Sequence, residues 1–302
     1  MTTRGTTLKH QSPERQVLLR PIVTRSYMFS VNHVACCGCS ICVTVCPRES
    51  IKLSPVNLEG GRIAIRPQID IDEHTCSFCG ECVALCPTHA LEMTVNGKPE
   101  VPVIKGNAFP SLVRKNVVNV AVCQQSSDTS YVEECPVGAI SVTFTEQEGT
   151  PRIADVQVDK PVCINCTRCM EKGPQGGFTV TKPYQGRIWL NTSLCPSGCQ
   201  ACADICPSHA ITYDGQQVAV DRRFCLFCSA CENVCPAPGA VQVARSGFVH
   251  TPITSATWIY AVDKLVSFKE VAREYDVKSQ VERRKLMLAE LGQSEPAPAG
   301  EK

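Results

Sequence analysis

Short apolar runs recur between residues 27 and 250, and the pattern around them predicts a series of small β-strands. Each run precedes a cysteine-rich loop, and a small-apolar pair such as Ala90-Leu91 follows the loop and begins another strand. A different pattern begins near Ser255, where apolar residues recur at helical spacing until Gly292. These residues are Val262, Leu265, Phe268, Ala272, Tyr275, Val281, Leu288 and Leu291. The chain therefore predicts a region of small sheets followed by a C-terminal helical extension.

The two ends of the chain lie outside the region of small sheets. Residues 1–26 carry scattered arginines and lysines with little apolar periodicity, which indicates an extended arm that becomes ordered against a partner. The helical extension, residues 251–292, is expected to dock into another subunit, and the alternative is that it folds back as a lid. Residues 293–302 include Pro296 and Pro298 and are expected to form a disordered tail.

The cysteines follow a repeat. Its unit is an Asp or Asn four residues before a cysteine, then Cys-x2-Cys-x2-Cys-x3-Cys-Pro, then the step into the next strand. Four copies are intact, and one of them has an extra residue in its first gap. The intact copies begin at Cys36, Cys76, Cys195 and Cys225, and the extra residue follows Cys195. Chance does not produce four copies of this spacing in one chain.

Two further copies, the third and fourth along the chain, are incomplete in a coordinated way. The third keeps Cys123 and Cys135 at its two ends. Ser126 and Thr129 stand between them, where its second and third cysteines belong. The fourth has Gly173 in place of its last cysteine. Its first three cysteines remain, and they are Cys163, Cys166 and Cys169.

A rule of ligation explains which positions were lost together. When two such motifs bind two 4Fe-4S clusters, the first three cysteines of each motif hold one cluster and its fourth ligates the other. Under this rule Ser126, Thr129 and Gly173 all belong to one cluster, so one cluster is lost and its neighbour is complete. Pairing the six copies assigns five sets of ligands. The sets are Cys36, Cys39, Cys42 and Cys86; Cys76, Cys79, Cys82 and Cys46; Cys163, Cys166, Cys169 and Cys135; Cys195, Cys199, Cys202 and Cys235; and Cys225, Cys228, Cys231 and Cys206.

The predicted fold class is α+β: a tandem array of three bacterial-type two-cluster ferredoxin-like modules, each with small β-sheets and short helices, before the C-terminal helical extension. The expected modules span residues 27–100, 101–185 and 186–250, and the middle one retains a single cluster. The predicted cofactors are therefore five 4Fe-4S clusters. Two cysteines are left over: Cys37, interpreted as a bystander thiol or an alternative ligand, and Cys123, interpreted as a relict of the lost cluster.

Composition agrees with bound metal. The chain has 22 cysteines in 302 residues without a secretory signal pattern, which favours thiolate ligands in a reducing compartment over disulfides. No apolar stretch approaches the roughly 18 residues of a membrane span, so a cytoplasmic protein without membrane contact is expected. Thirty basic and 29 acidic residues nearly cancel, which argues against nucleic acid as a partner. Aromatic residues make up only 6%, so folding is expected to depend on the clusters.

Closed four-thiolate sites transfer electrons and leave no open corner for a substrate, so no catalytic residue is predicted. Three alternatives stay open at this point. Zinc ribbons seldom have the third cysteine or the Cys-Pro step. The Cys195-x3-Cys199 gap matches radical enzymes that use S-adenosylmethionine, but Cys206 supplies a fourth ligand. An iron-sulfur enzyme would need an exposed corner, and the damaged middle module is the candidate. His89 and His209, which follow Cys-Pro steps, are expected to be polar loop residues.

Segments outside the cysteine motifs allow a narrower statement. His250-Thr251-Pro252-Ile253-Thr254-Ser255-Ala256-Thr257-Trp258, Ala108-Phe109-Pro110-Ser111-Leu112-Val113-Arg114-Lys115 and the three-residue gap after Cys195 resemble the polyferredoxin subunit of formylmethanofuran dehydrogenase. The resemblance covers roughly residues 27–270. It implies an electron-transfer subunit, not catalytic alone, in the complex that reduces carbon dioxide in the first step of methanogenesis.

The resemblance also implies partners. They are a tungsten- or molybdenum-pterin subunit that makes formate, an amidohydrolase-like subunit that attaches the formyl group to methanofuran, a small ferredoxin subunit, and a heterodisulfide reductase-type module or a soluble ferredoxin. The alternative within this class is a polyferredoxin of a hydrogenase or another oxidoreductase complex. The chain departs from the family by its missing middle cluster. The remaining middle cluster is then expected either to bridge the flanking modules or to pass electrons to a neighbouring subunit.

Overall fold

The structure is a computed structural model that describes residues 6–147, 150–253, 255 and 258–290. In the first cysteine region, β3 (Ser26–Asn32) precedes the first motif and pairs antiparallel with β8 (Leu91–Val95), which follows the second motif. Likewise β4 (Ile51–Leu53) pairs with β7 (Ile69–Ile71), so each motif connects one strand pair to the other. The third cysteine of each motif lies on a short helix, α1 (Ile41–Val45) or α2 (Glu81–Ala84).

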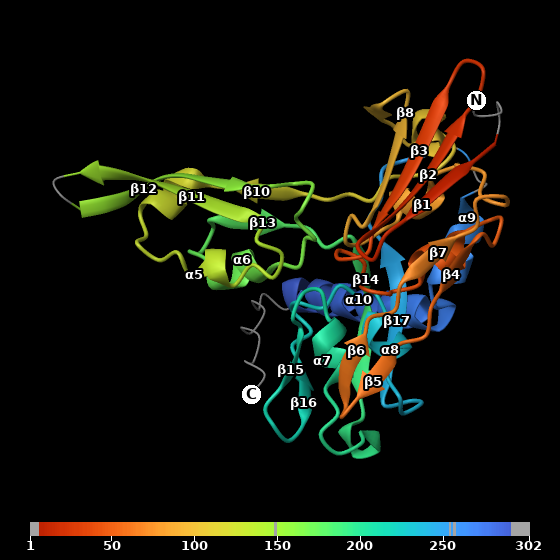
Figure 1. Ribbon diagram of the computed structural model, residues 1–302. Helices are drawn as coiled ribbons and strands as arrows, with labels where there is room; N and C mark the ends of the chain where they lie inside the picture. The colour runs from red at the N-terminus through yellow and green to blue at the C-terminus, as the bar shows by residue number, and fades with distance from the viewer. Residues whose placement is uncertain (1–5, 148–149, 254, 256–257, 291–302) are drawn as a thin grey trace.

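The same crossed pairing recurs in the middle and last cysteine regions (Figure 1). The middle region has β10 (Asn116–Val118) paired with β13 (Phe178–Val180), β11 (Ile140–Gln147) paired with β12 (Thr150–Val158), and helices α4 (Val120–Gln124), α5 (Ser130–Glu133) and α6 (Arg168–Lys172). The last region has β14 (Tyr184–Leu190) paired with β17 (Val241–Phe248), β15 (Ile211–Tyr213) paired with β16 (Val218–Val220), the 3-10 helix η1 (Thr192–Leu194), and helices α7 (Ala201–Ile205) and α8 (Ala230–Asn233). The repeat seen in the sequence is thus a repeat of paired strands.

The N-terminal segment differs from the extended arm expected for residues 1–26. From Leu8 onward it forms β1 (Leu8–Gln11) and β2 (Arg15–Pro21), which extend a five-stranded sheet ordered β1-β2-β3-β8-β9, with β9 at Lys98–Pro99. The Leu18 side chain is fully buried. Gln16, also fully buried, donates to Asp70 Oδ1 at 2.5 Å and accepts from the Ile71 amide at 3.0 Å. The partner that orders this segment is therefore the chain's own first region.

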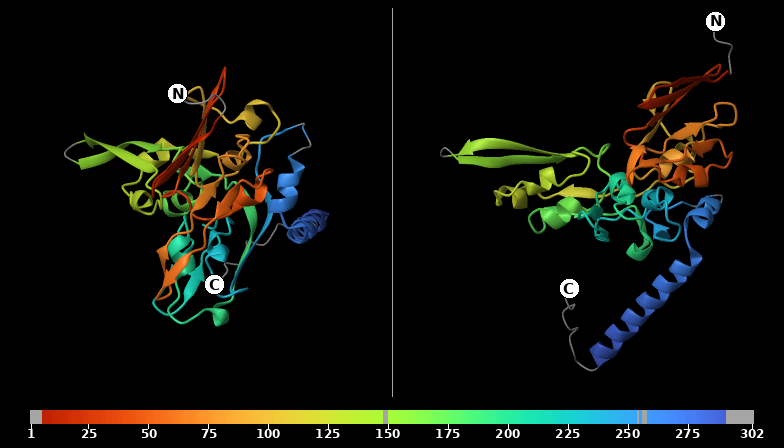
Figure 2. Two further views of the ribbon diagram at one scale, coloured as in Figure 1. Left: turned by 45° about the vertical axis from the view of Figure 1, so that its right-hand side comes forward. Right: turned by 60° about the horizontal axis from the view of Figure 1, so that its bottom comes forward.

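The C-terminal extension is broken where one continuous helix was expected. α9 (Ile259–Leu265) ends at Val266, whose backbone is extended, and the Ser267 amide donates to the Arg245 carbonyl of β17 at 2.7 Å. α10 (Phe268–Glu290) then runs outward from the body of the molecule, as Figure 2 shows. The α9 segment packs back against α1 and β17, whereas Phe268 at the start of α10 is 66% exposed. The expected tail, residues 293–302, lies outside the described residues. No helix within the described ranges is long and apolar enough to cross a membrane.

Two hydrophobic cores divide the molecule. The larger core combines buried residues of the first and last regions and includes Ile164 and Cys166 from the near end of the middle region. The smaller core belongs to the middle region alone, which projects to one side in Figure 1. Linking segments complete the fold, with the hairpin β5 (Asn57–Glu59) and β6 (Arg62–Ile65) in the first region and α3 (Pro102–Lys105) after it. The first and last regions therefore fold against each other although they are far apart in sequence.

The tip of the β5–β6 hairpin makes one of these long-range contacts. The Gln200 amide of the last region donates to the Gly61 carbonyl at 2.8 Å. A Cβ on Gly61 would lie 2.7 Å from the Gly198 carbonyl oxygen, and Gly61 also has a positive φ of +79°. Gly60 shares a positive φ, but a Cβ there would meet nothing within 4 Å. Comparing an alanine substitution at Gly60 with one at Gly61 therefore separates the free-energy cost of the left-handed backbone from the cost of the close approach to Gly198.

We expect Gly61→Ala to destabilise the contact between the first and last regions, by about 1–3 kcal/mol more than Gly60→Ala. Both substitutions carry the left-handed backbone cost of roughly 1–2 kcal/mol, so the difference reports the clash alone. Thermal unfolding under anaerobic conditions measures it, with hydrogen exchange of residues 57–65 as a local readout. Equal effects of the two substitutions would show that the close approach contributes nothing to stability.

Candidate metal centres

The cysteine loops curl because residues just before their second and third cysteines adopt left-handed conformations. Glycine occupies some of these positions, as expected, but phenylalanine, asparagine, serine and threonine occupy others despite the steric cost. The left-handed residues are Gly38, Ser40, Phe78, Gly80, Asn165, Thr167, Gly198, Phe227 and Ser229. The Phe227 amide donates to the Cys225 sulfur at 3.4 Å within such a curl. The loops therefore turn backbone N–H groups inward toward their own sulfurs.

A second turn follows each Cys-Pro step. The residue three positions after the fourth cysteine has a positive φ in four motifs, at Glu49, His89, Gly138 and His209. The next amide then donates to the sulfur of that cysteine, as Ala139 does to Cys135 at 3.3 Å and Ala210 does to Cys206 at 3.3 Å. His89 and His209, expected to be polar loop residues, thus occupy the turn that directs this hydrogen bond.

The thiols of the first predicted set converge. These four, Cys36, Cys39, Cys42 and Cys86, line one cavity. Burial, together with the neighbouring Cys39 and Cys86, raises the pKa of Cys36 to about 12. The second set, Cys76, Cys79, Cys82 and Cys46, also converges. Burial raises the pKa of Cys82, and the other three thiols of its set add to that rise.

The middle set surrounds another cavity, which is lined by Cys135, Cys163, Cys166 and Cys169. Burial raises the pKa of Cys169 to about 12, and the other three cysteines contribute. The Asn116 side-chain amide donates to the Cys163 sulfur at 3.1 Å. The structure thus brings Cys135 from the third motif to the three cysteines of the fourth.

The last region repeats the arrangement in two sets. Cys206, Cys225, Cys228 and Cys231 line one cavity. The remaining set is Cys195, Cys199, Cys202 and Cys235. Burial, together with Cys235, Cys199 and Cys195, raises the pKa of Cys202 to about 12. Three of this set, Cys195, Cys199 and Cys235, are half-buried rather than buried.

The donor chemistry of all five sets fits an iron-sulfur cluster. Four thiols that mutually raise one another's pKa cannot all ionise unless a cation joins them, and thiolate is the soft ligand that iron-sulfur clusters require. Inward amide donors would further stabilise negative charge on the sulfurs. Each set therefore suits a 4Fe-4S cluster.

Side chains fill the part of the middle region where the sequence predicts a lost cluster. Tyr131 is fully buried, Phe178 is 3% exposed, and their ring centroids lie 5.0 Å apart. A Cβ on Gly173 would lie 2.8 Å from the Phe178 ring, so a larger side chain has no room there without repacking. Cys123 is fully buried in the same small core. An aromatic pair thus packs where the repeat would put a further cluster, and Cys123 packs beside it as a small apolar residue.

We expect Phe178→Ala to destabilise the middle region by about 3–5 kcal/mol, because it empties this aromatic core. Phe144→Ala is the matched control on the same region, since Phe144 is 57% exposed and its loss should change stability by at most about 0.5 kcal/mol. Anaerobic denaturant unfolding, followed by hydrogen exchange of β10 and β13, measures both. A small effect of Phe178→Ala would indicate that the aromatic pair does not hold this half of the region together.

Cys37 lies at a contact between the first and last regions. It is 3% exposed, and hydrogen bonds with Cys228 and Cys39, together with burial, raise its pKa. The same hydrogen bond lowers the pKa of Cys228 to about 7. Nearby, Asn233 Nδ2 donates to the Gly38 carbonyl at 2.8 Å. Cys37 therefore bridges a thiol of the first set and a thiol of the last region rather than joining a set of its own.

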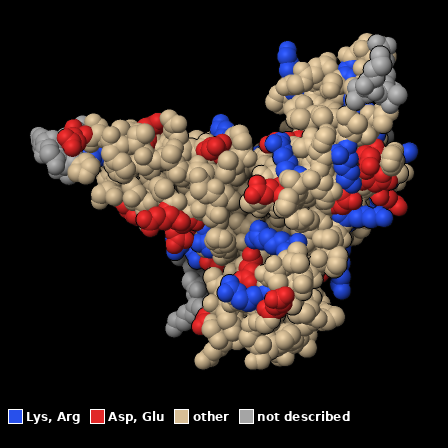
Figure 3. Space-filling view, viewed as in Figure 1, with Lys and Arg blue, Asp and Glu red and all other residues tan. Residues whose placement is uncertain are grey.

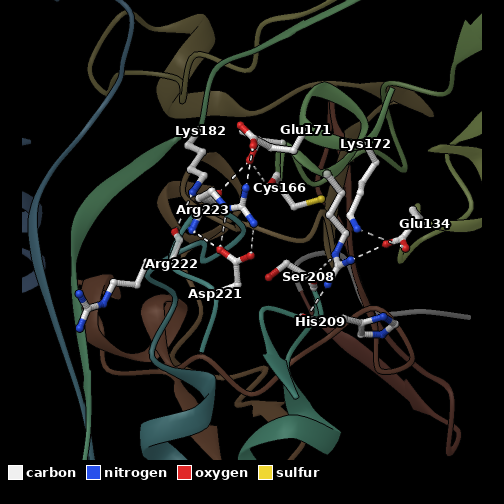
Figure 4. A network of polar contacts seen from close by, with 12 residues as sticks. Glu134, Cys166, Glu171, Lys172, Lys182, Ser208, His209, Asp221, Arg222 and Arg223 are labelled. Atoms are coloured by element: carbon white, nitrogen blue, oxygen red, sulfur yellow. Dashed lines mark hydrogen bonds and ion pairs between the residues drawn. The ribbon is translucent and has the colours of Figure 1, made fainter. Parts of the chain in front are cut away.

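A polar network connects the middle and last regions, as Figure 4 shows. Arg168 donates to the Ser208 carbonyl at 2.8 Å, to the His209 carbonyl at 2.6 Å and to Glu134 at 2.6 Å. Thr167 Oγ1 donates to the Arg223 carbonyl at 2.9 Å. The loop that holds Cys166 is thus fixed against the loop that follows Cys206 and the loop that precedes Cys225. Elsewhere on the face seen in Figure 3, acidic and basic side chains are interspersed.

Sequence reasoning missed the side chains that stand between the sets. Arg245 and Lys182 follow no spacing rule, because their neighbours come from distant parts of the chain. Arg114 lies in the segment noted only for its resemblance. Its hydrogen bonds to the Cys86 and Pro87 carbonyls are visible only in three dimensions. The left-handed Phe78 and Phe227 were also not foreseen, although each stands two residues after the first cysteine of its motif, the position of the left-handed Gly38 and Asn165 in two other motifs.

Comparison with known proteins agrees with these sites. A family model described as a 4Fe-4S dicluster domain matches residues 35–90 and 194–238. An uncharacterized ferredoxin of Methanocaldococcus jannaschii is 33% identical over 57 residues, which is 19% of this chain and 74% of that ferredoxin. A chain in the formate dehydrogenase, heterodisulfide reductase and formylmethanofuran dehydrogenase complex of Methanospirillum hungatei has the same fold. The TM-score is 0.74 at 24% identity, and the match covers 88% of this chain and 93% of that one.

Proposed function

The chain belongs to the 4Fe-4S ferredoxin family, and from this premise we propose that it is an electron-transfer subunit with five clusters in three ferredoxin-like modules. A 4Fe-4S cluster held by four thiolates accepts and returns single electrons without binding a substrate. The ligands proposed are the five sets of cysteines, with Cys37 and Cys123 outside them. The crossed strand pairing of all three regions supports the count of three modules.

The contacts between sets support one connected route, and this observation carries the proposal. Three sets meet at the centre: the first inner set (Cys36, Cys39, Cys42, Cys86), the middle set (Cys163, Cys166, Cys169, Cys135) and the last inner set (Cys225, Cys228, Cys231, Cys206). Asn233, just after Cys231, donates to the Gly38 carbonyl in the loop of the first inner set at 2.8 Å, and the buried Cys37 lies in the same loop. Thr167 connects the loop of the middle set to the loop of the last inner set.

The remaining two sets lie one step farther out. Cys82 of the first outer set (Cys76, Cys79, Cys82, Cys46) is close enough to raise the pKa of Cys42. Cys202 of the last outer set (Cys195, Cys199, Cys202, Cys235) similarly contributes to the raised pKa of Cys231. The lost site occupies the outer end of the middle module, away from the shared core. Its loss therefore shortens one arm and leaves the other sites connected.

We further propose that the chain serves a formylmethanofuran dehydrogenase complex, in which it passes low-potential electrons to or from a pterin-metal subunit. The resemblance of its non-cysteine segments supports this, and so does the fold shared with a chain of the Methanospirillum complex. The proposed partners are the pterin-metal, amidohydrolase-like and small ferredoxin subunits, with a heterodisulfide reductase-type module or a soluble ferredoxin on the other side. A substrate-binding role is less well supported, because aromatic side chains fill the damaged site.

Anaerobic purification of the native protein, with mass spectrometry of whatever stays bound, tests the assignment. Co-purification of a pterin-dependent subunit together with an amidohydrolase-like subunit is the expected result. Hydrogenase subunits in their place would overturn the formylmethanofuran assignment and leave the electron-transfer function standing. Iron and acid-labile sulfide near zero in the anaerobic protein, with zinc present, would overturn the electron-transfer function as well.

A further inference from the structure

We propose that three half-buried cations, Arg114, Arg245 and Lys182, one at each contact between the three central sets, raise the reduction potentials of the clusters on both sides. Electrons that enter at either outer set would then settle at the centre of the molecule. The inference rests on the proposed function, because it concerns how this chain tunes clusters that its cysteines hold. It assigns a role to residues that ligate nothing.

Arg114 stands between the first inner set and the middle set. Its guanidinium donates to the Cys86 carbonyl and to the Pro87 carbonyl, the latter at 3.1 Å. Burial lowers the pKa of Arg114, while Cys86 and Cys163 act in the opposite direction. One cation therefore lies close to a ligand of each of the two sets. It comes from the linker between the first and middle regions, just before β10.

Arg245 stands between the first and last inner sets. It donates from β17 to the Phe227 carbonyl at 2.8 Å, to the Cys228 carbonyl at 2.7 Å and to Ser229 Oγ at 3.0 Å. Its guanidinium carbon also lies 5.9 Å from the centre of the Tyr184 ring, and the Tyr184 hydroxyl donates at 2.5 Å to the Leu85 carbonyl, next to Cys86 of the first inner set. The fixed hydrogen bonds to the loop of the last inner set hold the cation at this contact.

Lys182 completes the triangle between the middle set and the last inner set, and Figure 4 shows it in the polar network that also contains Cys166. Its Nζ donates to the Arg222 carbonyl at 3.3 Å and lies 5.6 Å from the centre of the Phe227 ring. Burial lowers the pKa of Lys182, and Cys225 and Cys166 oppose this effect more than any other named neighbours. The lysine is thus drawn toward thiols of two different sets.

Charge explains why these positions affect potential. Reduction adds a negative charge to a cluster, so a nearby cation stabilises the reduced form, and partial burial weakens screening by solvent. The last outer set provides the contrast. The groups that shift the pKa of Cys195 are burial and two cysteines of its own set. The first outer set has Arg20 near Cys76. The difference in nearby positive charge between inner and outer sets is therefore largest at the last outer set.

The test is a redox titration of the anaerobic full-length protein, followed by electron paramagnetic resonance. Lys182→Gln should lower the reduction potentials of two of the five clusters. Each should change by about 59 mV for one electron, which corresponds to about a tenfold change in the ratio of oxidised to reduced cluster. Lys182→Arg should restore both steps because it keeps the charge. Arg152→Gln, on the exposed edge of β12 away from the sets, should shift none.

Combining substitutions identifies which clusters respond. Arg114→Gln should shift two steps, and it should shift only one when Cys166→Ala has removed the middle cluster. Arg114→Lys and Arg245→Lys keep the charge and guard against loss of structure in the glutamine variants. The inference fails if the steps stay in place, if all five move together, or if the charge-retaining variants shift them equally. Absence of reducible clusters in the unaltered protein would instead overturn the proposed function, and the inference with it.

Discussion

Replacing Cys166 with alanine should remove one cluster and lower the iron and labile sulfide content by about a fifth. Cys166 is 8% exposed and lines the cavity of the middle set, where three thiols cannot complete a four-thiolate site. Cys123→Ala is the matched control. Cys123 is also buried but faces the aromatic core instead of a set, so its loss should leave the iron content unchanged. Quantitative iron analysis per chain, on protein purified anaerobically, decides between them.

The Cys166→Ala variant also tests the route that electrons take between the two ends of the protein. The first and last inner sets adjoin through Cys37, so electron flow between the two ends should continue without the middle cluster. Stopped-flow reduction from a surface donor measures this electron flow. The quantity recorded is the rate at which the cluster farthest from the donor is reduced. Loss of end-to-end transfer in Cys166→Ala would show that the middle set carries the route and that the contact at Cys37 does not.

Removing the iron should unfold most of the first and last regions. Their shared core contains many of the predicted cysteine ligands among its buried residues, and each set without its cluster leaves facing thiols and empty volume. The loss is of the order of a domain's whole stability, about 5–15 kcal/mol. Hydrogen exchange of the chelated protein should show protection lost in α1, α2, α7 and α8. The pairing of β10 with β13 beside Tyr131 and Phe178 should persist longest, because side chains fill that core.

Iron release by a chelator should also accelerate as pH falls. Burial raises the pKa of Cys166 to about 11 and that of Cys169 to about 12, so each free thiol is protonated throughout the physiological range. Protons therefore compete with iron for every ligand, and the competition grows as pH decreases. The rate of iron loss measured at several pH values tests this, and a rate that does not change with pH would contradict the competition between protons and iron.

Local spacing in the sequence determined which cysteines converge. The first three cysteines of each motif lie within one loop, so their grouping depends on a few residues of backbone. The fourth joins the other motif of its pair because the two motifs connect the same strand pairs. The loss of one site was visible for the same reason, since Ser126, Thr129 and Gly173 occupy equivalent positions in a repeat. Short strands before and after each loop also followed from local pattern.

Features that depend on distant partners were decided only by the tertiary structure. Residues 8–21 lacked a recognisable strand signal, yet β3 offered an open edge and Asp70 a partner for Gln16. The break after α9 reflects the hydrogen bond of Ser267 to β17. Which sets adjoin, and why Cys37, Arg114, Arg245 and Lys182 stand between them, depends on how the first, middle and last regions pack against one another. Such contacts join residues about two hundred positions apart, as Gly38 and Asn233 are, and no local pattern encodes them.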